Sequence, residues 1–353
     1  MAPSLNAHLS DVCDDRNNNF NLLRLGAAMA VVLSHSFILT GNEPNSIPRG
    51  IGYLAVNCFF IMSGFLVCKS AFHHRLIVDF YKSRALRIFP ALIVAVIFSA
   101  MIIGPLHTNL SLSDYFGDSQ TYKFIIKNLT LINGIEHHLP QVFNERVNQS
   151  VNAPLWTLVF EIYLYFILGL IAFFTLKRST VDEASQSFNI TVFLLTLICF
   201  VLYVYTIAIE RFDTRLLEHS VRFTSLFGIG ALFYIARKKT KLSPTILSIL
   251  ICILLLSSPW LLLHKTLLYP IVAYVLLYLA YIPKSFFLKF NRLGDYSYGV
   301  YIFAYPIQQS IVTWHATISS HVLFISSMVV TLLVAIPCWH VLEKRALKLK
   351  ANA

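Results

Sequence analysis

The sequence LLRLGAAMAVVLSHSFIL, residues 22–39, is a nearly continuous apolar run that contains two ionisable side chains, Arg24 and His35. A run of this length can cross the roughly 30 Å hydrocarbon core of a bilayer as an α-helix. The two side chains are eleven positions apart, which corresponds to roughly 16 Å along a helix axis. Ionisable groups inside a bilayer are costly and persist where they line a cavity or meet a partner. The run therefore predicts a transmembrane helix that carries functional groups.

The composition of the whole chain is that of an integral membrane protein. Of 353 residues, 57% are hydrophobic and 13% are charged, whereas a soluble domain needs far more polar surface. The formal charge of +11 could indicate nucleic-acid binding, but Lys and Arg stand in short clusters beside apolar segments. That placement is a topology signal. We expect an all-α, polytopic bundle in a lipid bilayer, with no nucleic-acid partner.

Apolar runs between turn and charge signals predict ten spans. They lie at 22–41, 51–71, 88–107, 155–175, 190–209, 221–236, 243–263, 266–283, 297–314 and 322–342. The division into domains follows from these runs: a polar cytoplasmic N-terminus over 1–21, one membrane domain over 22–342 and a basic cytoplasmic tail over 343–353.

Basic residues cluster after every second span, which sets the expected orientation. They are Lys69, Arg75, Lys82, Arg84, Arg87, Lys177, Arg178, Arg237, Lys238, Lys239, Lys241, Lys284, Lys289, Arg292, Lys344, Arg345, Lys348 and Lys350. Loops rich in Lys and Arg stay in the cytoplasm. Both termini are therefore predicted to be cytoplasmic, in agreement with an even number of spans.

The longest outer connection runs from Thr108 to Pro154 and is too long for a plain turn. Within it, TYKFIIKNLTLI, residues 121–132, favours a short amphipathic or re-entrant helix, with a structural lid as the alternative. The six cysteines lack the spacing of metal ligands. We therefore assign no metal site and no disulfide.

His35 and Glu161 are the candidate catalytic pair. Glu161 lies in PLWTLVFEIYLYF, about six residues inside its span, and His35 lies about five residues inside the first span. Both are thus roughly 8 to 9 Å below the outer boundary and can meet at one depth. A carboxylate that accepts from one imidazole nitrogen leaves the other nitrogen as a base for a hydroxyl group. A static buried pair, or helix-to-helix hydrogen bonding alone, is the structural alternative.

Arg24, Arg84 and Arg87 lie near the predicted cytoplasmic ends of the first and third spans. Three guanidinium groups together can bind phosphates through charge-assisted hydrogen bonds, which would suit a nucleotide-bearing donor. Snorkelling to lipid headgroups is the alternative for each one alone. Ser63 and Gly64 interrupt an aromatic stretch of the second span. They predict either a narrow passage for a slender donor chain or close helix packing.

Two residues are candidates for contact with an acceptor on the outer side. Trp156 lies beside the proposed pair, where its ring could stack on an acceptor, and Arg222 opens the sixth span. Interface-belt packing of the Trp and headgroup anchoring of the Arg are the alternatives.

Taken in order along the chain, these residues resemble the acyltransferase-3 family of polytopic membrane acyltransferases. The resemblance rests on Arg24 with His35, on CFFIMSGFL, on SRALRIFPAL with its Arg84 and Arg87, and on PLWTLVFEIYLY; SYGVYIFAYPIQQ and VLEKRALKL are similar to late family segments. Ala304 stands where many relatives carry His. That departure argues against a catalytic role for the YIFAYPI segment.

The resemblance implies a multi-pass enzyme of the bacterial inner membrane. It implies cytoplasmic acyl-CoA, most often acetyl-CoA, as donor and an extracytoplasmic carbohydrate hydroxyl, in O-antigen, exopolysaccharide or a lipid-linked oligosaccharide, as acceptor. No permanently bound cofactor is implied. A proton-coupled transporter or flippase of a polar lipid or sugar remains the alternative, with the same His and Glu as a proton relay.

Overall fold

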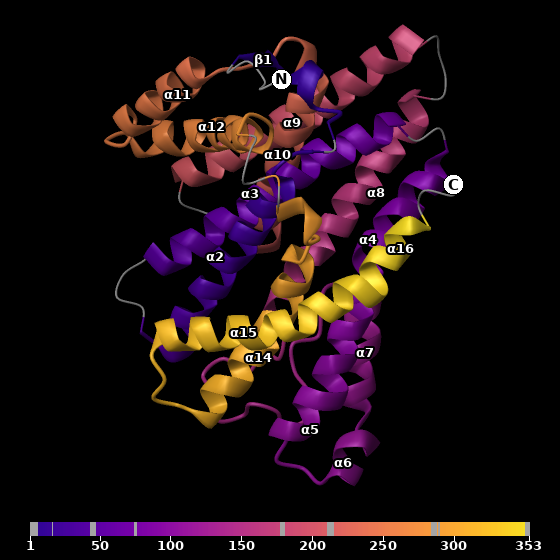
Figure 1. Cartoon of the computed structure of the whole chain (residues 1–353), viewed down its shortest axis with the longest axis vertical. Coiled ribbons are helices and arrows are strands. Elements are labelled where there is room, and N and C mark those ends of the chain that lie inside the picture. Colours follow the sequence, from indigo (N-terminus) through magenta and orange to yellow (C-terminus); the bar gives the residue numbers. More distant parts are fainter. Residues whose placement is uncertain are drawn as a thin grey trace. The chain divides into compact units, whose positions relative to one another are not determined.

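The computed structural model describes residues 6–15, 17–42, 47–73, 76–176, 181–209, 215–283, 288 and 290–349 (Figure 1). Most of these residues are helical. The chain forms two compact units. Unit 1 consists of Met1–Leu23, Asn57–Tyr81 and Tyr163–Leu293, and unit 2 consists of Arg24–Val56, Lys82–Ile162 and Gly294–Ala353.

The described elements follow one another along the chain with short connections. They are β1 Ala7–His8, α1 Leu9–Val12, α2 Phe20–Thr40, α3 Ile47–His73, α4 Ile77–Phe98, α5 Gly104–His107, α6 Leu112–Gly117, α7 Ser119–Thr130, α8 Trp156–Leu176, α9 Val181–Ile209, α10 Arg215–Ile235, β2 Lys241–Leu242, α11 Pro244–Leu256, α12 Leu261–Tyr281, α14 Ser297–Trp314, α15 Ser320–Cys338 and α16 Lys344–Lys348. The two short strands pair antiparallel.

Two π-helical turns extend long helices. Ser99–Ile103 joins α4 to α5, and Trp339–Glu343 joins α15 to α16. Short 3₁₀ turns precede α8, at Ala153–Leu155, and follow α10, at Ala236–Lys238. A third is Phe290–Arg292. Such π turns inside helices are often found at functional sites.

The all-α, multi-pass prediction is confirmed at the level of the helices. Each of the ten predicted spans falls on a helix, and seven helices of the described residues are long and apolar enough to cross a membrane. The count of ten spans and the cytoplasmic termini stay predictions. So does the amphipathic or re-entrant character of 121–132, although α7 does form over Ser119–Thr130.

Several boundaries differ from the sequence prediction. α9 begins at Val181, not at residue 190, and α10 begins at Arg215, not at residue 221. α4 begins at Ile77, not at residue 88, because the helix continues through the basic stretch that hydropathy alone excludes. α11 ends at Leu256 and α12 begins at Leu261, so the turn lies before the predicted break at 263–266. Six of the basic residues used for the orientation lie outside the described residues: Arg75, Lys177, Arg178, Lys284, Lys289 and Lys350.

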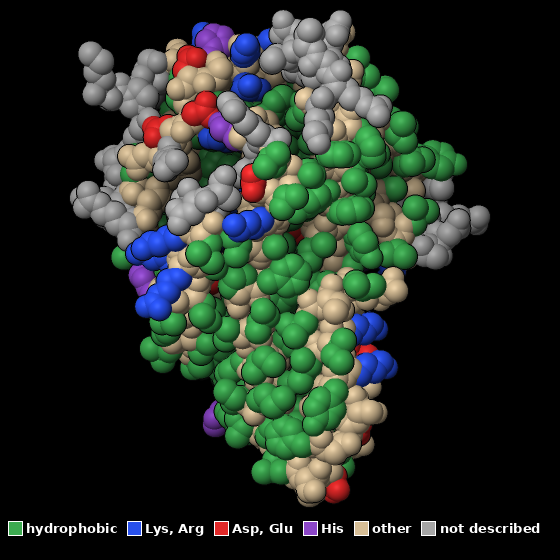
Figure 2. Space-filling view, turned by 90° about the vertical axis from the view of Figure 1, so that its right-hand side faces the viewer, with side chains coloured by type: hydrophobic (Ala, Val, Ile, Leu, Met, Phe, Trp, Pro, Cys, Tyr) green, Lys and Arg blue, Asp and Glu red, His purple; other side chains and the backbone are tan. Residues whose placement is uncertain are grey.

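The surface of unit 1 exposes many apolar side chains. Along α9, apolar side chains are exposed on successive turns, with Ile190 at 49%, Leu194 at 49%, Ile198 at 57% and Val201 at 55%. Figure 2 shows hydrophobic side chains spread widely over one face of the molecule. Exposed apolar area on this scale is untenable in water and typical of lipid contact.

Inside unit 1, α3 and α10 approach so closely that glycine is needed at the contact. A methyl group on Gly64 of α3 would overlap the backbone carbonyl of Phe227 in α10, and one on Gly230 of α10 would overlap the carbonyl of Ile61. Small residues at such positions let helix backbones touch. Gly64 therefore has a packing role, whatever its part in donor binding.

Inside unit 2, α14 packs against α2 and α15. Tyr305 and Val312 of α14 form a buried cluster with Leu39 of α2 and Leu323 of α15. Gln308 of α14 donates to the carbonyl of Val32 at 2.9 Å and to the hydroxyl of Ser36 at 2.7 Å. These bonds fix α14 on the stretch of α2 that carries His35.

Alanine substitutions on α3 test the close approach. Gly64→Ala should destabilise the protein by about 1–3 kcal/mol, because the added methyl group meets rigid backbone. Gly50→Ala on the same helix meets no atom within 4 Å and should stabilise by up to about 1 kcal/mol through helix propensity. The measurement is the thermal unfolding midpoint in detergent. Equal midpoints for the two variants would contradict the packing role.

Candidate active site

Two of the predicted donor-binding arginines meet at one buried carboxylate in unit 2. Arg24 of α2 donates through Nη1 to Oδ2 of Asp295 at 3.3 Å, and Arg87 of α4 donates through Nη2 to the same oxygen at 2.6 Å. The Asp295 side chain is 6% exposed. Burial opposes ionisation here, but the two guanidinium groups and hydrogen bonds from Ser297 outweigh it and hold the pKa of Asp295 below its usual value. The cluster thus keeps one positive charge in excess.

The turn before α14 places Asp295 at this point. Gly294 has a φ of +126°, a conformation that side-chain-bearing residues rarely adopt. The hydroxyl and backbone N–H of Ser297 donate to Oδ1, which leaves Oδ2 for the arginines. The sequence analysis missed this residue. One signal could have found it, since Asp295 is the only acidic residue between Glu218 and Glu343.

A second acidic residue and the third arginine belong to the same unit. Arg84 lies one turn before Arg87 on α4, where its Nε donates to the hydroxyl of Ser83 at 3.2 Å. Glu343, in the π turn after α15, is 1% exposed and interacts electrostatically with Arg87 and Asp295. Neither of its carboxylate oxygens has a hydrogen-bond partner among the described residues. Asp295 and Glu343 lower the net positive charge that the arginines alone would give.

His35 lies at the other end of α2 and is half-buried. Its ring meets that of Tyr305 edge to face, with centroids 5.0 Å apart. The two hydrogen bonds of Gln308 flank it, at Val32 and Ser36. The YIFAYPI segment therefore contacts the predicted base through Tyr305.

Glu161 of α8 also interacts with α14. Thr157, one turn earlier on α8, shares a hydrogen bond of 2.7 Å with the hydroxyl of Tyr301. Glu161 itself interacts electrostatically with Tyr301. Tyr301 and Tyr305 are one turn apart on α14. Both predicted catalytic side chains thus approach neighbouring turns of α14, and their direct pairing stays a prediction.

The remaining predicted residues have well-defined surroundings. Ser63 shares a hydrogen bond of 2.9 Å with Tyr165 in unit 1. Arg222, also in unit 1, is 2% exposed, lies 4.0 Å from the carboxylate of Glu218 and stacks on Phe223. Trp156 begins α8 in unit 2, and its ring meets Phe160 edge to face. The donor role of Ser63 and the acceptor roles of Trp156 and Arg222 stay predictions.

The chemistry available here is that of acid, base and charged groups. Within the described part of the chain, no three His, Cys, Asp or Glu side chains cluster as metal ligands would. The site offers a His beside a Tyr at one end of α2. It offers arginines held by a carboxylate at the other end. That combination suits transfer of a group from an anionic donor to a hydroxyl, with His as base.

A multi-pass helical protein with this arrangement fits the class of membrane acyltransferases. The chain belongs to the acyltransferase-3 family, since the family model, described as an acyltransferase domain, matches residues 17–340. The predicted family is therefore confirmed, and the protein is an enzyme, an acyltransferase. The family match favours this function over the transporter alternative.

Two relatives are similar in sequence. An O-acetyl transferase of Shigella phage Sf6 is 29% identical over 344 residues, which cover 94% of this chain and 96% of that protein. The Nodulation protein 10 of Rhizobium leguminosarum bv. viciae is 39% identical over 99 residues, or 27% of this chain and 26% of that protein. No solved structure matches the chain. The long first alignment supports the predicted O-acetyltransferase activity.

Neutralising the shared carboxylate tests the arginine cluster. Asp295→Asn should destabilise the protein by about 3 kcal/mol, because losing one partner of a buried ion pair leaves the other charges uncompensated. Asp79→Asn, also a loss of one acidic charge, lies in the first turn of α4 and should cost under about 1 kcal/mol. Unfolding midpoints in detergent compare the two. A midpoint for Asp295→Asn no lower than that for Asp79→Asn would refute the ion-pair assignment.

Proposed function

We propose that the protein transfers an acetyl group from cytoplasmic acetyl-CoA to a hydroxyl of an extracytoplasmic glycan, such as O-antigen, exopolysaccharide or a lipid-linked oligosaccharide. The observation that carries the proposal is the layout of α2. One end holds Arg24 in the cluster with Arg87 and Asp295, and the other holds His35 against Tyr305. The family and the O-acetyl transferase relative support the reaction. The setting would be the bacterial inner membrane.

The donor would bind at the arginine cluster. Phosphate groups accept paired hydrogen bonds from guanidinium groups, and an arginine already positioned by a carboxylate loses less freedom on binding. Arg84, one turn from Arg87, would add a third donor group. The roughly 16 Å between Arg24 and His35 is of the order of an extended pantetheine arm. The thioester could therefore reach His35 while the phosphates stay near Arg24.

The reaction at His35 needs no oxidant and no metal for its atom balance. His35, oriented by Glu161, takes the proton of the glycan hydroxyl as its oxygen attacks the thioester carbonyl. A carbon–oxygen bond forms and the carbon–sulfur bond breaks. The coenzyme A thiolate leaves and receives the proton. Transfer through an acetylated His35 would give the same products. Trp156, five positions before Glu161 on α8, would contact the acceptor.

Removing the base tests the catalytic assignment. His35→Ala should lower the rate of acetyl transfer about 100- to 10,000-fold, the usual contribution of a general base. Glu161→Ala should also abolish most transfer, because the imidazole loses its orientation. The exposed His315→Ala is the matched control and should keep normal activity. The assay supplies radiolabelled acetyl-CoA to membranes with a panel of de-O-acetylated bacterial O-antigen oligosaccharides. Full activity in His35→Ala would refute the assignment.

A second substitution separates donor binding from chemistry. Arg84→Ala should raise the KM for acetyl-CoA about 10- to 100-fold, since one hydrogen bond to a charged group contributes about 1.5–3 kcal/mol. The KM for the glycan should not change. Lys82→Ala removes an exposed positive charge from the same helix and serves as the control. An unchanged KM for acetyl-CoA in Arg84→Ala would remove this residue from the donor site.

A further inference from the structure

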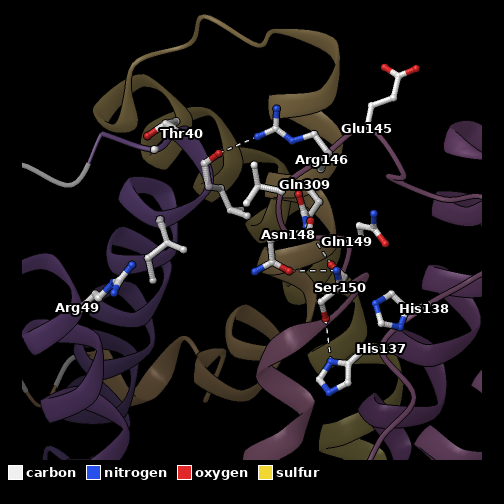
Figure 3. A pocket seen from close by; sticks show the side chains of 14 residues that line it. Thr40, Arg49, His137, His138, Glu145, Arg146, Asn148, Gln149, Ser150 and Gln309 are labelled. Carbon is white, nitrogen blue, oxygen red and sulfur yellow. Dashed lines mark hydrogen bonds between the residues drawn. The ribbon is translucent and has the colours of Figure 1, made fainter.

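A cavity of about 940 Å³ opens in unit 2 at the Thr40 end of α2. Its wall consists of the last turn of α2, Arg49 of α3, residues 137–138 and 145–150 of the long loop after α7, and Gln309 of α14 (Figure 3). Sites for small molecules usually enclose roughly 300 to 1,000 Å³. None of the residues that the sequence predicted for catalysis or binding lines this cavity.

The cavity lies one helical turn beyond His35 on two helices. Ile38 and Leu39 of α2 line it, three and four positions after His35. Gln309 of α14 lines it four positions after Tyr305, whose ring contacts His35. One turn of helix rises about 5.4 Å. A ligand in the cavity can therefore present one of its groups to the imidazole.

Hydrogen bonds hold the loop wall to both helices. Arg146 donates through Nη2 to the carbonyl of Leu39 at 2.7 Å. Gln309 donates through Nε2 to the carbonyls of Asn148 and Ser150, at 2.7 and 3.0 Å. Figure 3 shows these side chains around the opening. The wall is thus preorganised and does not have to be ordered by its ligand.

The backbone of this loop is strained next to the wall. Gln141 has a φ of 54° and Phe143 a φ of 60°, both in the left-handed region that bulky residues avoid. Hydrogen bonding fixes the strained turn, as Thr108 donates to the carbonyl of Pro140 at 2.8 Å. Strained loops that the surrounding structure holds in place concentrate at binding and active sites.

The lining chemistry fits hydroxyl groups better than an acyl chain or a nucleobase. The described residues that line the cavity include three amides, two hydroxyls, two imidazoles and two guanidinium groups, but no Phe, Tyr or Trp for stacking. The Nε of Arg146 is buried and has no hydrogen-bond partner among the described residues. Burial, aided by His138, lowers the pKa of His137, and its Nδ1 shares a hydrogen bond of 3.0 Å with the hydroxyl of Ser150. Glu145 extends away from the opening (Figure 3).

We infer that this cavity binds the acceptor saccharide, which it holds by hydrogen bonds to sugar hydroxyls, with Arg146 as the central donor. The inference rests on the proposed function and adds the place of the acceptor to it. The sugar that is acetylated, or the one next to it, occupies the cavity and directs one hydroxyl toward His35. Gln149, exposed on the wall, marks the entrance.

Filling the cavity tests the inference. Gln149→Trp keeps the Arg146 hydrogen bond to Leu39 and should raise the KM for the acceptor oligosaccharide at least tenfold, with the KM for acetyl-CoA unchanged within twofold. Arg146→Ala should act in the same direction and Arg146→Lys less strongly. Thr317→Trp, on the exposed loop between α14 and α15, is the matched control. Binding of each oligosaccharide of the panel is also measured by calorimetry without acetyl-CoA, in wild type and in His35→Ala.

The two proposals fail in different ways. In one outcome, the wild-type protein binds an oligosaccharide but acetylates no glycan, and Gln149→Trp loses the binding. That outcome supports the cavity as a saccharide site and refutes only the proposed function. In another outcome, wild type and Gln149→Trp acetylate the glycan with the same KM and bind it equally well. That outcome overturns only the assignment of the cavity as the acceptor site. A wild-type protein that binds no oligosaccharide of the panel overturns the cavity assignment as well.

Discussion

The pairing of α14 with α2 is the constraint on which the rest of unit 2 depends. Asp295, at the entry to α14, holds Arg24, and Tyr305 meets His35 farther along both helices. Between them, Gln308 donates to two oxygens of α2. Polar groups buried between helices have little contact with solvent, and here each finds its partner on the neighbouring helix. The pairing therefore fixes both ends of the candidate site at once.

The arginine cluster shows how a membrane protein can keep cations in its interior. Two guanidinium groups share one oxygen of Asp295, while Ser297 occupies the other. Burying the two cations together with the carboxylate costs less free energy than burying two isolated cations, because the attraction between opposite charges offsets part of the desolvation penalty. The same arrangement leaves an excess of positive charge, which an anionic donor can neutralise on binding. Under the proposed function, structural stability and donor recognition would come from the same side chains.

The positions of the helices and of the charged side chains within them could be predicted from hydrophobic runs and residue types. Every predicted span lies on a helix, since a run of about twenty apolar residues has few other ways to satisfy its backbone in a bilayer. Arg24, Arg87, His35 and Glu161 were found because charge is rare in such runs. The start of α4 was placed too late because hydropathy does not register a helix that continues through basic residues.

The sequence alone determined the helical membrane class, the family resemblance and the side chains that carry charge inside it. Only the tertiary structure decided which of them share a carboxylate, that Tyr305 contacts His35 while Tyr301 interacts with Glu161, and that Gly64 is needed where two backbones touch. It also revealed Asp295 and the cavity beside α2. The physical reason is that the hydrophobic pattern of a helix can be read from residues that are close together in the sequence. A partner for a buried charge comes from a helix hundreds of residues away, and no local pattern specifies which one.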